Sequence, residues 1–141
     1  MKRIIRFVSV ILILVMGLSG IASAAYADEM VPYSNAYIRS IGATVSKSGD
    51  TLYVTFTVKG TGPMTSIGAS CVQIYTAGGT PVKTFWSSSN PSMLGSNCTV
   101  HTSSVSYDGT DGTSYYAVVT GYASNSSGSS TETYTTSTIT L

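Results

Sequence analysis

The chain offers few side chains from which a catalytic site could be built. His101 is its only histidine, and together with Asp108 or Asp111 and any of the many serines it suggests a Ser-His-Asp hydrolase. Such a triad depends on geometry, and in many hydrolases on a strained nucleophile turn of sequence G-x-S-x-G. The chain contains no such turn sequence. We therefore predict that the protein is not an enzyme and that His101 lies on the surface or at the rim of the fold.

Two carboxylates lie close together in the segment Asp108-Gly-Thr-Asp111-Gly. Neighbours on one turn are poorly placed to flank a glycosidic bond, as the paired acids of glycosidases must. Their oxygens could bind calcium, although the segment lacks the regular D-x-D-x-D-G spacing and a bidentate Glu. A plain double turn explains the same residues. Asp108 and Asp111 are therefore a speculative metal site, and no cofactor is predicted.

Cys71 and Cys98 are the only cysteines. A disulfide between them would close a loop and stabilise a small exported domain by about 3 to 4 kcal/mol. Alternation along the two segments places Cys71 on the face opposite to Val72, whereas Cys98 shares a face with Val100. The disulfide is predicted, but it requires a bulge or a change of face.

Aromatic residues on expected strands are the best candidates for ligand contacts. The candidates lie on predicted strands and are Trp86, Phe85, Tyr53 and Tyr75. Phe85 and Trp86 are adjacent, so alternation places them on opposite faces. Exposed flat rings can stack on sugars or anchor a protein partner at low entropic cost. Cross-strand packing of aromatic and Thr side chains on an exposed sheet is the simpler explanation. We treat these four residues as speculative ligand-binding residues.

The N-terminal 27 residues have the three parts of a secretory signal peptide. Lys2, Arg3 and Arg6 precede the apolar run 7–18, and small residues lead to a cleavage site near Ala27. An uncleaved anchor is the alternative, but the run is short for a bilayer. We predict a secreted, extracellular protein with no membrane insertion after processing.

The remaining residues 28–141 are poor in charge and rich in Ser and Thr. Such a chain offers little counterion release to nucleic acids and little attraction to anionic lipids, so neither partner is predicted. The shortage of helix-forming residues and the abundance of Thr, Val and Tyr favour strands. The composition therefore predicts an all-β domain.

Period-two alternation and turn residues divide this part into strands. The clearest alternation lies at 51–58, where Leu52, Val54, Phe56 and Val58 share one face. Gly60-Thr61-Gly62-Pro63 is expected to end this strand. The predicted strands are 37–46, 51–58, 69–75, 82–86, 97–106, 115–123 and 131–140.

Six or seven short antiparallel strands at this spacing predict a two-sheet sandwich, with a small barrel as the alternative. The domains are then a signal peptide at 1–27, a flexible lead-in at 28–36 and a single β-sandwich at 37–141. Gly112-Thr113-Ser114-Tyr115 and the Asn125-x-x-Gly128 turn before a Thr-rich strand resemble the closing strands of immunoglobulin-like, fibronectin type III domains. The resemblance implies an immunoglobulin-like sandwich.

The whole chain also resembles a group of short exported proteins of Gram-positive gut bacteria. The resemblance rests on Val72-Gln73, on Val82-Lys83-Thr84 before Trp86-Ser87, and on the tyrosine-bearing strand after a Gly turn. It implies compartment and fold, and no function can be transferred from it.

Two functions fit these features, and a small secreted enzyme is a third, disfavoured one. The first is a non-catalytic extracellular binding module for a protein or glycan. The second is a self-associating structural protein of the cell surface, which would pair through its uncharged 51–57 face or its last strand.

Overall fold

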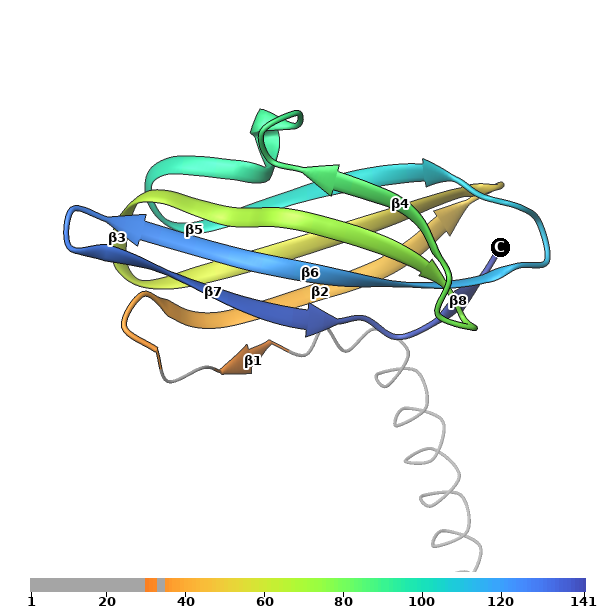
Figure 1. Cartoon of the computed structure of the whole chain (residues 1–141), viewed down its shortest axis with the longest axis horizontal. Helices are drawn as coiled ribbons and strands as arrows, with labels where there is room; N and C mark the ends of the chain where they lie inside the picture. The colour runs from red at the N-terminus through yellow and green to blue at the C-terminus, as the bar shows by residue number, and fades with distance from the viewer. Residues whose placement is uncertain (1–29, 33–34) are drawn as a thin grey trace, which may run out of the picture.

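The computed structural model describes residues 30–32 and 35–141, and most of this part is β-structure (Figure 1). The predicted signal peptide lies outside the described residues. Within these residues no helix is long and apolar enough to cross a membrane. The elements are β1 (Val31–Pro32), β2 (Ile38–Ser48), β3 (Thr51–Thr76), β4 (Pro81–Trp86), the 3-10 turn η1 (Pro91–Met93), β5 (Leu94–Asp108), β6 (Ser114–Asn125), β7 (Gly128–Thr135) and β8 (Ile139–Thr140). The all-β prediction is confirmed.

The strands form one antiparallel hydrogen-bonded sheet that curls around a shared core. Its order is β1-β2-β3-β6-β7, while β4 and β5 pair with β3 and β8 pairs with β6. The first half of β3 pairs with β2 and β5, and its second half pairs with β4 and β6 and, at residues 64–68, with the start of β5. β3 therefore joins two halves of the sheet that lie on opposite sides of the core.

β3 is longer than the sequence suggested, because its 26 residues cover both 51–58 and 69–75. Gly60, Gly62 and Pro63 do not end the strand. They lie where the pairing with β5 shifts register between Lys59 and Met64. Glycine and proline are tolerated at such a bulge, where a strand bends without losing its direction. The glycines and the proline that were expected to end the strand therefore mark a bend within it.

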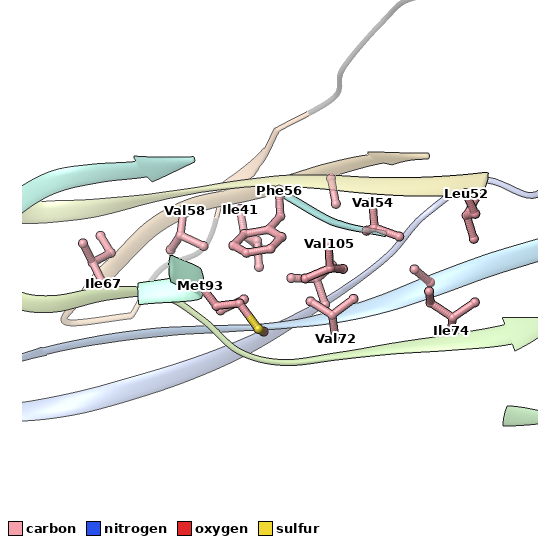
Figure 2. Packing of buried hydrophobic residues seen from close by; sticks show 14 of the residues in the cluster. Ile41, Leu52, Val54, Phe56, Val58, Ile67, Val72, Ile74, Met93 and Val105 are labelled. Carbon is pink, nitrogen blue, oxygen red and sulfur yellow. The ribbon is translucent and has the colours of Figure 1, made fainter. Parts of the chain in front are cut away.

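Alternation along β3 builds the core. Figure 2 shows Val54 and Phe56 from the first half of the strand pointing toward Val72 on the second half. Met93 closes the core from η1 and is fully buried. The largest fully buried side chains are Phe56, Ile38, Ile41, Leu52, Ile67, Ile74, Met93, Val54, Val58, Val72 and Val119. The predicted inward face of 51–58 is confirmed.

Both ends of the domain differ from expectation. Val31–Pro32, inside the expected flexible lead-in, pairs with β2 as a short strand. The expected last strand 131–140 is divided into β7 and β8. Thr136 lies between them, buried, and its hydroxyl accepts a 2.9 Å hydrogen bond from the Ala117 backbone N–H. The Thr136 hydroxyl accepts the hydrogen bond that a backbone carbonyl would accept if β7 continued, so the strand ends here.

Candidate functional site

One outer face of the sheet carries exposed Trp86 together with half-buried Tyr75 and Tyr116. Val72 and Ile74 of β3 point into the core, so Cys71, Gln73 and Tyr75 point outward. Cross-strand partners share a face, so the outward residues of β4 and β6 lie beside them. We call this surface the aromatic face, and it comprises Cys71, Gln73, Tyr75, Thr84, Trp86, Tyr116, Val118 and Thr120. None of these residues is charged.

Trp86 is the most exposed large apolar side chain of the described residues, at 56%. It ends β4, an edge strand, opposite Cys71. The backbone N–H groups of Ser89 and Asn90 and the Asn90 side-chain amide all donate to the Trp86 carbonyl. These bonds fix the backbone at the end of β4. The indole is therefore presented to solvent from a rigid position.

Two tyrosines extend the aromatic face along the sheet. The rings of Tyr75 and Tyr116 stack with centroids 5.3 Å apart and an interplanar angle of 12°. The Tyr75 hydroxyl donates to Gln73 Oε1 at 2.9 Å. This bond orients the Gln73 amide and leaves its two N–H donors without a partner in the described part of the chain. The result is a flat aromatic pair beside an oriented hydrogen-bond donor.

The four aromatic residues singled out from the sequence do not form one site. Trp86 and Tyr75 share the aromatic face. Phe85 lies on the other side of β4, packed against the core, with the Lys83 ammonium 5.5 Å from its ring centroid. Tyr53 is 38% exposed on the outer face of the other half, between Ser46 and Ser106. Tyr116, a strand aromatic outside the four, joins the aromatic face, and its stacking on Tyr75 depends on the pairing of β3 with β6.

The predicted disulfide is not formed, because Cys71 and Cys98 are both free. Cys98 is paired with Met64 on β3, and Cys71 lies seven residues farther along the same strand. At about 3.3 Å per residue the two are separated by roughly 20 Å. A disulfide requires Cα atoms within about 7 Å. Export to an oxidising compartment favours a disulfide but does not determine which residues pair across the strands.

The two free thiols differ in environment, and this difference predicts different reactivity. Cys71 is buried, and burial raises the pKa of its thiol above the ordinary value of 9.0. Its thiolate fraction at neutral pH is therefore lowered. We expect iodoacetamide at pH 7.5 to label half-buried Cys98 at least about ten times faster than Cys71. Mass spectrometry of the native protein measures both rates, and faster labelling of Cys71 would contradict the prediction.

His101 lies at the rim of the core on edge strand β5, and its Nε2 is 2.9 Å from the Ser92 backbone oxygen. No serine hydroxyl forms a hydrogen bond with it among the described residues. The Cys98 thiol lies in the same region, because its Sγ and His101 Nδ1 both lie within 3.0 Å of the position that a Cβ on Gly95 would take. The C-x-x-H spacing was visible in the sequence, but alternation places such residues on opposite faces.

The two carboxylates lie on the rim of the first half of the sheet. Asp108 Oδ1 accepts a 3.0 Å hydrogen bond from the Thr51 hydroxyl, and Asp111 lies in the following turn. Within residues 30–32 and 35–141 no group of three or more His, Cys, Asp or Glu side chains could hold a metal ion. Calcium binding at Asp108 and Asp111 stays a prediction.

No family model matches the chain, and no curated protein sequence matches it. The function is therefore inferred from the side chains described above.

Proposed function

We propose that the protein is a secreted, non-catalytic binding module that holds a neutral polysaccharide chain on its aromatic face. The observation that carries the proposal is the 56% exposure of Trp86 on the same face as the stacked Tyr75–Tyr116 pair. A ligand that covers the indole buries a large flat surface with little loss of side-chain entropy.

The chemistry of the face favours a glycan. Sugar rings present C–H groups that pack on aromatic rings and hydroxyls that bond to amides and hydroxyls. Gln73, Thr84 and Thr120 supply these polar groups between the rings. The face has no charged residue to attract a polyanion. Trp86 and Tyr75 lie four residues apart in register, about 13 Å, so a chain rather than a single sugar is needed to reach both.

We also propose an immunoglobulin-like architecture for the module. Leaving out the two-residue strands β1 and β8 and counting β3 as two strands gives seven, beginning with β2. The first, second and fifth then lie in one half of the sheet and the third, sixth and seventh in the other. Constant-type immunoglobulin domains divide these strands in the same way. The fourth strand, β4, lies beside the third instead of beside the fifth. The proposal is therefore for a relative of the constant-type topology.

Affinity electrophoresis through gels that contain single neutral polysaccharides tests the proposed binding. We expect at least one of a panel of glucans, mannans, xylans and galactans to retard the protein. The Trp86→Ala and Tyr75→Ala variants should bind at least tenfold more weakly, because each removes a ring that the ligand covers.

Tyr53→Ala is the matched control, because it removes an exposed tyrosine from the other half of the sheet. It should bind as the unmodified protein does. Equal loss of retardation in Tyr53→Ala and Trp86→Ala would overturn the assignment of the face. Mobility that no polysaccharide changes would overturn the choice of glycan.

Self-association remains a second candidate, although only one of its two expected edges is free. The last strand is such an edge, because β7 pairs only with β6. Residues 51–57 pair on both sides and cannot accept another strand. The 15-residue β5 pairs only with β3 and carries Asp108 as its one acidic or basic residue besides His101. Long edges with little charge favour pairing with another chain. Sedimentation velocity at increasing concentration distinguishes this candidate, because only self-association raises the sedimentation coefficient.

A further inference from the structure

His101 occupies a slot that two glycines leave open. A Cβ on Gly68 would lie 3.0 Å from His101 Cδ2, and a Cβ on Gly95 would lie 2.6 Å from Nδ1. These distances are shorter than an ordinary carbon contact, so the imidazole fills space that only glycine provides. Nε2 lies 2.9 Å from the Ser92 carbonyl oxygen. A carbonyl only accepts, so Nε2 carries the proton and the lone pair is on Nδ1.

The Nδ1 lone pair shares its surroundings with a thiol. The same Cβ position on Gly95 lies 3.0 Å from Cys98 Sγ, so the sulfur and Nδ1 converge on one small space. Residues three apart on a regular strand would face opposite ways. Here the pairing with β3 shifts register between Val100 and Cys98. This irregularity interrupts the alternation between Cys98 and His101, so that both side chains can lie on one side.

We propose that Cys98 Sγ and His101 Nδ1 bind one Cu(I) ion. The arrangement is that of a metal-binding histidine, whose other nitrogen donates to a backbone carbonyl and so fixes the ring. Thiolate and imidazole are donors that copper accepts, and thiolate selects its reduced form. Cys98, His101 and Gly95 are all partly exposed, so an ion can enter.

The number and charge of the donors distinguish Cu(I) from Zn²⁺. Structural zinc takes four ligands, and the described residues hold no group of three His, Cys, Asp or Glu side chains. Cu(I) is stable with two donors. On binding, the S–H bond breaks, the proton leaves to solvent and an S–Cu bond forms, so the thiolate neutralises the ion. No carboxylate is needed.

Met64 offers a third soft donor next to the pair. It is buried and is the cross-strand partner of Cys98, which places their Cβ atoms about 5 Å apart. Thioether sulfur also favours Cu(I) over harder ions. The site is distinct from the aromatic face and does not depend on the proposed function.

The test is an anaerobic titration with Cu(I) held by a chromogenic chelator. The protein is expressed from the full sequence and is used in the form that the cell produces. We expect one equivalent to transfer to the protein. Because His101 is the only histidine, a single pair of imidazole ¹⁵N signals reports on it. Before copper the Nε2–H tautomer should dominate, and copper should shift Nδ1 while Nε2 stays protonated.

Three variants make the outcome decisive. Cys98→Ser and His101→Gln should each weaken Cu(I) affinity at least a hundredfold, whereas Cys71→Ser should leave it unchanged. Circular dichroism checks that all three fold. A fourth variant, Met64→Leu, keeps the core volume and should weaken binding by a smaller factor. Equal loss of affinity in Cys71→Ser, or no transfer of copper to the unmodified protein, would overturn the proposal. Tight binding of Zn²⁺ with no preference for Cu(I) would also overturn it.

Discussion

Replacing Phe56 by alanine is expected to lower the free energy of unfolding by about 4 kcal/mol. Phe56 is 1% exposed and is one of the largest side chains of the core. It lies in the middle of the first half of β3, where neighbours on three sides cannot collapse into the space left behind. Domains of this size have a total stability of about 5 to 15 kcal/mol, so the loss is a large part of the whole. Urea unfolding followed by circular dichroism measures it.

Tyr53→Ala is the matched control on the same strand. Tyr53 points outward and is 38% exposed, so its removal should cost about 1 kcal/mol or less. Equal costs for Phe56→Ala and Tyr53→Ala would contradict the assignment of the two faces of β3.

A single methyl group at Gly68 is expected to destabilise the domain by about 3 kcal/mol. Its φ of +149° is a conformation that other residues rarely adopt. A Cβ at this position would lie 2.0 Å from the Met93 carbonyl oxygen, which is backbone and cannot move aside without η1. The Gly68→Ala variant must therefore push η1 outward and withdraw Met93 from the core. Urea unfolding measures the cost, and the His101 imidazole signals should shift because its ring borders Gly68.

Gly62→Ala is the control for this change. Gly62 lies on the same strand, and a Cβ there would meet nothing within 4 Å. Its cost should stay within about 0.5 kcal/mol. A Gly68→Ala variant as stable as Gly62→Ala, with unchanged His101 signals, would show that η1 does not pack on Gly68.

Local sequence patterns predicted the elements and the faces of the fold well. Alternation at 51–58 assigned Phe56 to the core and Tyr53 to the outside, and both assignments are confirmed. The same rule placed Tyr75 opposite to Val72 and Ile74. These results follow because the period of a strand is fixed by the backbone and needs no knowledge of its partners.

Properties that depend on register were beyond the sequence. The stacking of Tyr75 on Tyr116 and the distance between Cys71 and Cys98 are set by which residues pair across strands. Gly60 and Pro63 are ambiguous for the same reason, since they allow either a turn or a bend. The Cys98–His101 pair depends on the register shift between Cys98 and Val100, which no local pattern in the sequence marks.

The most direct test of the proposed function is the protection of Trp86 from a collisional quencher by a bound polysaccharide. Trp86 is the only tryptophan, so all indole fluorescence reports on the aromatic face. Acrylamide should quench the free protein strongly because the ring is 56% exposed. If the account is right, saturating polysaccharide lowers the quenching constant at least threefold, at the concentration that retards the protein in gels. Retardation with no change in quenching would contradict it, because the ligand would then be bound elsewhere.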